Sequence, residues 1–196
     1  MIRKRYSLTT NRDEIRKGLN MKVISKIAIL SLVTASTVFA QSPRQVGAWS
    51  VYTLTANVTG KNVVMLQTTA VGQQVPAKLD IVCKNDRVVA VAVEIQSSID
   101  EHTVSYSQAV PTTRVVFAVE GKGSVSENWE VADGGRTLSP YSELSQAKLN
   151  RTWVERISGT PKMVLQLNQK EGDDSLAPVF DTAELSEALS SVGCTK

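Results

Sequence analysis

The sequence predicts a mainly β protein of the α+β class: a single antiparallel β-sandwich-like domain with a C-terminal helix tied to the sheet by a disulfide. Most segments between residues 48 and 168 alternate apolar and polar side chains over short runs, which is typical of strands with one buried face. The last apolar stripe instead has helical spacing, and Cys83 and Cys194 end one such strand and this helix. Together these observations favour a β-sheet to which a disulfide joins the C-terminal helix.

The first half of the domain is predicted to form four successive strands. They cover residues 48–54, 62–69, 77–83 and 87–95, and each is rich in valine, leucine or isoleucine. Asn85-Asp86 supplies a tight turn between the last two, which favours a hairpin. Because the strand over 87–95 carries four valines, we expect it to lie in the centre of the sheet, covered on both faces.

The second half mixes strands with one helix. We expect strands over 102–107 and 112–120, a short strand over 128–132, and a further alternating strand over 162–168. Residues 141–152 have a better helical composition, with apolar and basic side chains at helical spacing. A sheet interrupted by one helix follows from this order.

The C-terminal helix has the clearest start and stop signals. Asp181-Thr-Ala-Glu184 has the form of a capping box, with a side-chain acceptor first and a glutamate three residues later. An apolar stripe follows, and Gly193 is placed to end the helix. Cys194 comes directly after it.

Residues 21–40 have the features of a secretory signal peptide: a basic start, an apolar run and a small-x-small site with cleavage between Ala40 and Gln41. The apolar run is too short for a stable membrane span, which needs roughly 20 residues. Residues 1–20 are interpreted as an upstream extension or a mis-assigned start, with a cytosolic extension as the alternative. We expect residues 41–196 to be exported as one domain, periplasmic or secreted, with disorder limited to a few residues around 41–45 and the tip near 171–175.

The charge balance excludes nucleic acid as an expected partner. Residues 1–40 hold eight of the 22 Lys/Arg and two of the 19 Asp/Glu, so the +3 charge of the whole chain becomes about −3 for residues 41–196. A nucleic-acid-binding protein needs a basic face for phosphate contacts, and the mature segment has no Lys/Arg cluster.

The two cysteines are expected to form one disulfide. After export an even count of two favours a bridge, which would close a loop of about 110 residues. The alternative is two buried thiols that never meet. A redox-catalytic role is disfavoured because Cys83 and Cys194 have no Cys-x-x-Cys spacing.

Candidate catalytic residues are few. His102 is the one histidine, so any Ser-His or Cys-His mechanism needs it, and its neighbours Asp100 and Glu101 could orient the imidazole. No Gly-x-Ser-x-Gly turn is present. A solvated loop histidine is the simpler interpretation, so we predict no catalytic residue and no enzyme, and keep a hydrolase around His102 as an alternative.

No metal or cofactor site is predicted. One histidine and two separated cysteines give no recognised zinc spacing, and the acidic residues 171–175 lack the ligand pattern of a calcium loop. The glycines at 121–123 and 134–135 lack the strand-to-helix context of a phosphate loop. A carboxylate pair for glycoside cleavage stays open, because pairing in space is not visible in a sequence.

The order of landmarks carries a resemblance to a known family. A Leu-x-Ile-x-Cys strand ends at Cys83, a strand led by Arg114 follows, then a Trp-x-Val-x-Asp-Gly segment begins at Trp129, and a terminal helix ends at Cys194. In this order the chain resembles the VasI/TagO family of periplasmic proteins associated with type VI secretion. The resemblance implies Arg114 and Trp129 as possible partner-binding residues. The alternatives for them are a strand arginine paired with a surface carboxylate and a core tryptophan.

We therefore expect a non-enzymatic periplasmic accessory protein without a cofactor, which acts by binding envelope or secretion-machinery proteins. The alternative from another class is a secreted small-ligand-binding or enzyme-inhibitor module. The sequence leaves the oligomeric state open.

Overall fold

The computed structural model describes residues 42–55, 62–72, 76–96, 98–99, 103–107, 109–142, 145–167 and 177–194. Within them the elements are β1 (Arg44–Val46), β2 (Trp49–Thr55), β3 (Asn62–Thr69), β4 (Ala77–Lys84), β5 (Arg87–Ile95), β6 (Ser105–Ser107), β7 (Val110–Val119), β8 (Gly123–Ala132), the 3-10 helix η3 (Asp133–Gly135), β9 (Thr137–Pro140), α2 (Gln146–Ile157), β10 (Lys162–Leu167), β11 (Val179–Asp181) and α3 (Leu185–Ser191). The predicted leader with its Ala40–Gln41 cleavage point, His102 and the acidic segment 171–175 lie outside the described residues.

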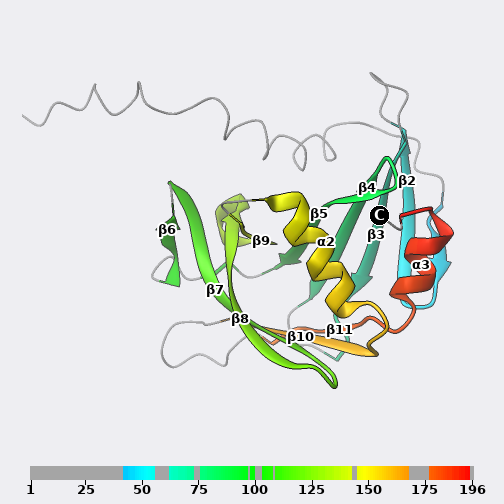
Figure 1. Ribbon diagram of the computed structural model, residues 1–196. Helices are drawn as coiled ribbons and strands as arrows, with labels where there is room; N and C mark the ends of the chain where they lie inside the picture. Colours follow the sequence, from blue (N-terminus) through cyan, green and yellow to red (C-terminus); the bar gives the residue numbers. More distant parts are fainter. Residues whose placement is uncertain are drawn as a thin grey trace, which may run out of the picture. The chain divides into compact units, whose positions relative to one another are not determined.

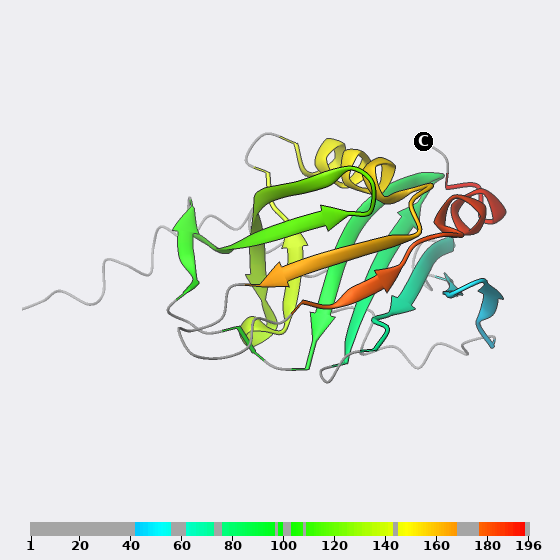
Figure 2. The same ribbon diagram turned by 90° about the horizontal axis from the view of Figure 1, so that it is seen from below.

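The strands form one bent antiparallel sheet. Its order is β1-β2-β3-β4-β5-β9-β8-β7-β10-β11, with β6 paired to β7 beside this path. The strands β1 to β5 form a meander, and β9 joins them to the second half, which contains β8, β7, β10 and β11 (Figure 1). The two halves face each other without closing the sheet (Figure 2). The predicted mainly β, sandwich-like class is confirmed.

The core lies between the two halves, on the concave side of the sheet. Val51, Leu66, Ile81 and Val91 pair directly across β2, β3, β4 and β5, and all four are buried. Because paired residues share a face, this row defines the inner face of the first half. Buried residues of β7, β8 and β10 face it from the second half.

Helix α2 covers the concave side and links both halves. Trp153 contacts Phe117 of β7 and Trp129 of β8, with ring centroids 5.3 and 5.5 Å apart. On its other flank, Asn150 Nδ2 donates to the carbonyl of Val89 at 2.9 Å. Val89 lies where a bulge shifts the β4–β5 register, so the asparagine satisfies a carbonyl in the irregular part of the ladder.

Several predicted elements need correction. Helix α2 begins at Gln146 rather than at 141, because the Ser145 side chain accepts from Lys148 N and caps it there. Strand β8 begins at Gly123 and so is five residues longer than the predicted strand over 128–132. Strands β1, β9 and β11 were not predicted, and β1 includes Arg44 and Gln45 of the segment expected to be disordered.

Strands β3 and β5 have the predicted bounds, and the Asn85-Asp86 turn between β4 and β5 is confirmed. Both turn residues have positive φ, 52° and 63°, a conformation that Asn and Asp tolerate better than most residues. The central position of β5 is also confirmed, since it lies between β4 and β9. The predicted burial of β5 on both faces holds only in part. Ala92 is buried, but the side chain of Val89 is 39% exposed.

A disulfide joins the C-terminal end of the chain to the sheet, as predicted. Helix α3 begins at Leu185, later than the capping-box motif indicated, because Asp181 ends β11 and its Oδ1 accepts from Ala183 N at 3.1 Å. Gly193, with φ 71°, follows the helix. Cys194 then forms the predicted disulfide with Cys83 of β4, across 111 residues of sequence.

The outward face of β4 carries a buried carboxyl group, Asp80, which is only 7% exposed. Gln67 Nε2 donates to its Oδ1 at 2.8 Å. Burial raises the pKa of Asp80 to about 6; the Gln67 hydrogen bond and Lys78 act in the opposite direction, and Glu94 adds to the rise. Folding therefore favours the protonated form.

Asp80 should make stability rise as the pH falls through 6 towards 4, because the folded chain then binds a proton that the unfolded chain does not. The shift of about two pKa units corresponds to about 3 kcal/mol. Asp80→Asn keeps an acceptor for Gln67 without the charge, so it should stabilise the protein by a comparable amount at pH 8 and by little at pH 4. Urea unfolding of both proteins across this range gives the difference, with the exposed Glu120→Gln as control. An equal pH profile for the wild type and Asp80→Asn would contradict the prediction.

Candidate functional site

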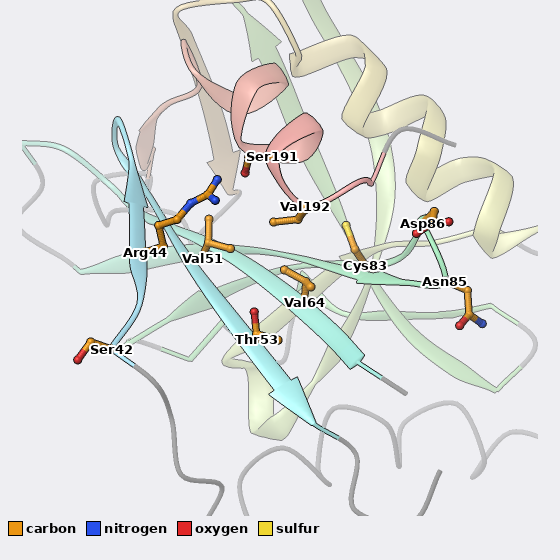
Figure 3. Close-up of a pocket in the computed structure, with 10 residues that line it drawn as sticks. All are labelled: Ser42, Arg44, Val51, Thr53, Val64, Cys83, Asn85, Asp86, Ser191 and Val192. Carbon is orange, nitrogen blue, oxygen red and sulfur yellow. The ribbon is translucent and has the colours of Figure 1, made fainter. Parts of the chain in front are cut away.

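A hollow in the described part lies beside the disulfide, where the inner face of the first half extends past the end of α3. Its volume is about 610 Å³. It is lined by Ser42, Arg44, Val51, Thr53, Val64, Cys83, Asn85, Asp86, Ser191 and Val192. Figure 3 shows these side chains around the space between β1, β2, β3 and the last turn of α3. A concave site of this size falls within the range of ligand pockets.

Two tight turns hold the walls of the hollow. Gly47, with φ 56°, lies in the two-residue connection between β1 and β2 and places Arg44 opposite Val51. A Cβ atom at Gly47 would lie 2.6 Å from the Glu184 side chain, so the turn is packed against the start of α3. At the opposite end, the Asn85-Asp86 turn brings two polar side chains to the rim (Figure 3).

The two ends of the hollow carry side chains of opposite charge. Arg44 lies at one end and points towards α3, whereas Asp86 lies at the other end beyond Cys83 (Figure 3). Neither residue forms a salt bridge with another residue in the described ranges. Val51, Val64 and Val192 form an apolar floor and wall between them. The arrangement can therefore hold an occupant with an apolar body, an anionic group near Arg44 and a cationic or donor group near Asp86.

The structure does not bring Arg114 and Trp129 together. Thr113 pairs with Trp129 and Arg114 with Asn128, so the register turns the two side chains to opposite faces of the sheet. Arg114 is exposed and its Nε donates to Ser126 Oγ at 2.6 Å. Trp129 is fully buried against Trp153, which is the core position weighed as its alternative. A partner-binding role for Arg114 stays a prediction.

The residues of the hollow were not identified from the sequence as a site. Asn85 and Asp86 were recognised only as a turn, and Arg44 fell in the segment expected to be disordered. A three-residue strand such as β1 is too short to give a periodic signal, and its pairing with β2 depends on the Gly47 turn. Cys83 was the one lining residue with a predicted role.

The described ranges contain no group of three or more His, Cys, Asp and Glu residues placed to hold a metal ion. None of their helices has the length and apolar character needed to cross a membrane.

Comparisons with protein families, curated proteins and solved structures found no match to this chain.

Proposed function

We propose that the chain is an exported accessory protein of the cell envelope, located in the periplasm, that acts by binding other proteins, and that the hollow beside the disulfide is its binding site. The observation that carries the proposal is that the inner face of the first half of the sheet opens into the hollow beside the disulfide. Val51 and Cys83 belong to the buried core, yet they also line a space open to solvent between charged ends. Core-type side chains at an accessible concave surface are typical of recognition sites.

The disulfide supports the proposed compartment. A bridge between distant cysteines persists where the surroundings are oxidising, as they are after export from the cytosol. The bridge also fixes the wall formed by Ser191 and Val192, because it joins the residue just beyond them to β4. A fixed wall lowers the ordering cost of binding.

The resemblance to VasI/TagO proteins, carried by the order of Cys83, Arg114, Trp129 and Cys194, suggests the class of partner. We propose secretion-machinery proteins of the envelope, with type VI components first among them. Arg114 is proposed as an additional contact, because its exposed guanidinium lies on the outward face of β7.

Site-specific photocrosslinking in cells tests the function. A photoreactive side chain at Thr53, inside the hollow, should capture an envelope protein that mass spectrometry identifies. The same group at Ser124, exposed on β8 in the other half of the sheet, is the matched control. Arg44→Glu should lower capture from Thr53 at least about tenfold if a charge-assisted contact is lost.

The results of this experiment distinguish a wrong binding site from a wrong function. Equal capture of one envelope protein from Thr53 and Ser124 would place binding elsewhere on the protein and refute the hollow as the site. No capture from either position would refute the protein-binding function.

The volume of the hollow also favours a second candidate, a module that binds a small ligand, because about 610 Å³ suits a drug-sized molecule. Native mass spectrometry of protein isolated from its cells should then show a bound mass that Arg44→Glu removes. A wild-type spectrum with only the apoprotein mass, together with crosslinking to a protein at Thr53, would decide against this candidate.

A further inference from the structure

The disulfide is part of the boundary of the hollow. Cys83 lines the space from β4, and Ser191 and Val192 line it from the end of α3. Cys194 follows Val192 by two residues and bonds to Cys83. Figure 3 shows the Cys83 side chain directed towards the segment that follows Val192. The bond therefore joins the floor of the hollow to one of its walls.

Within the described ranges, the hydrogen bonds donated by this wall all return to α3. The N–H groups of Val192 and Cys194 both donate to the carbonyl of Leu189, at 3.2 and 2.9 Å. The Ser191 hydroxyl donates to the carbonyl of Ala188 at 2.7 Å. The wall is joined to the sheet by the disulfide and by the apolar contact of the half-buried Val192 with the core. One half-buried valine is a weak anchor without the covalent bond.

The earlier part of α3 has anchors of its own. Leu185 and Ala188 are fully buried in the core. Glu184, which precedes the helix, packs against the β1–β2 turn, where a Cβ atom at Gly47 would lie 2.6 Å from its side chain. Loss of the disulfide should therefore loosen residues 191–194 and leave the body of the helix in place.

The bond is shielded once it has formed. Cys83 and Cys194 are only 4% and 3% exposed. Thiol–disulfide exchange requires an attacking thiolate to reach a sulfur atom, so reduction of the folded chain is slow. The oxidation state of the wall is therefore set when the chain folds and is kept afterwards.

We propose that formation of the Cys83–Cys194 bond switches on binding at the hollow, so that the chain binds its partner only after it reaches an oxidising compartment. This regulation rests on the proposed function, which places the binding site at the hollow. As the S–S bond forms, the two thiols lose two protons and two electrons, and a disulfide oxidant takes them up to become a dithiol. In a reducing cytosol both thiols persist, and binding then carries the added cost of ordering the wall.

Backbone ¹⁵N relaxation of the purified protein tests the effect on the wall without any partner. The order parameters of Val192 and Gly193 should be about 0.85 in the oxidised wild type and below about 0.6 in Cys83→Ser/Cys194→Ser. Those of residues 185–189 should keep the rigid value in both proteins. An equally rigid wall in the double serine variant would overturn the proposal.

Photocrosslinking in cells from Thr53, inside the hollow, tests the effect on binding. Per amount of folded protein, Cys83→Ser/Cys194→Ser should capture the partner at least about tenfold less than the wild type. Trp153→Ala is the matched control for lost stability, because it removes a buried side chain from the contacts with Phe117 and Trp129 and keeps the disulfide. It should capture as the wild type does. Circular dichroism of each purified variant establishes that it is folded.

A further variant loosens the wall and keeps the bond. A short run of glycines inserted between Val192 and Gly193 lengthens the segment from α3 to Cys194, while Cys83 and Cys194 can still pair. This variant keeps most of the stabilisation that the closed loop provides, and it should capture the partner as poorly as the double serine variant. It decides the question if the double serine variant does not fold.

Redox control and the proposed function fail in different ways. If the wild type captures a partner from Thr53 and both wall variants capture it equally well, redox control is overturned and the function stands. If the wild type captures nothing from Thr53, binding at the hollow is refuted, and its control by the disulfide with it.

Discussion

Replacing Cys83 and Cys194 together by serine is expected to lower the free energy of unfolding by about 4–5 kcal/mol. The bridge closes a loop of 111 residues, and the loop-entropy relation assigns a loop of this length about this stabilisation through the unfolded chain. For a domain of this size, the melting temperature should fall by about 10–15 °C.

Urea unfolding of the oxidised wild type and the double serine variant measures this loss. The wild type treated with a reductant is the matched control, because it removes the bond while keeping the side chains, and it should match the variant. A loss below about 1 kcal/mol would contradict the prediction and would mean that α3 holds its place by packing alone.

Trp153→Ala is expected to destabilise the protein by about 3–5 kcal/mol. Its fully buried indole fills the space between α2 and the second half of the sheet, in contact with Phe117 and Trp129, so truncation leaves a large cavity. Thermal and urea unfolding followed by circular dichroism measure the change without relying on tryptophan fluorescence.

Arg151→Ala provides the control on the same helix. Its side chain is 58% exposed and forms an ion pair with the exposed Glu155, so its loss should cost less than about 0.5 kcal/mol. Equal effects of the two substitutions would indicate that α2 contributes through helix formation and not through the tryptophan contacts.

The local part of the fold could be predicted from the sequence. Strand alternation and turn chemistry act over a few residues, and they placed β3, β5 and the Asn85-Asp86 turn between β4 and β5 correctly. The disulfide followed from cysteine count and expected compartment. The ends of the elements were less predictable, because several residues can cap the same helix. Ser145, and not an earlier serine, caps the start of α2.

The contacts between segments that are distant in the sequence could not be predicted. Strand β9, Thr137–Pro140, is too short for a periodic signal, yet it joins β5 to β8 and sets the bend of the sheet. The separation of Arg114 from Trp129 depends on the β7–β8 register, which a pattern alone does not fix. The hollow depends on where α3 stops over β2 and β3, a consequence of packing rather than of any motif.

The long span of the disulfide has a consequence for the order in which the molecule is made. When the proposed export runs from the N-terminus, Cys83 reaches the oxidising compartment 111 residues before Cys194, and the strands β1 to β5 all arrive before α3. Local hairpins form quickly, whereas contacts between distant segments must wait. The newborn domain therefore passes through a stage with a partly built sheet and a single reactive thiol, during which a wrong disulfide with another chain competes with the native one.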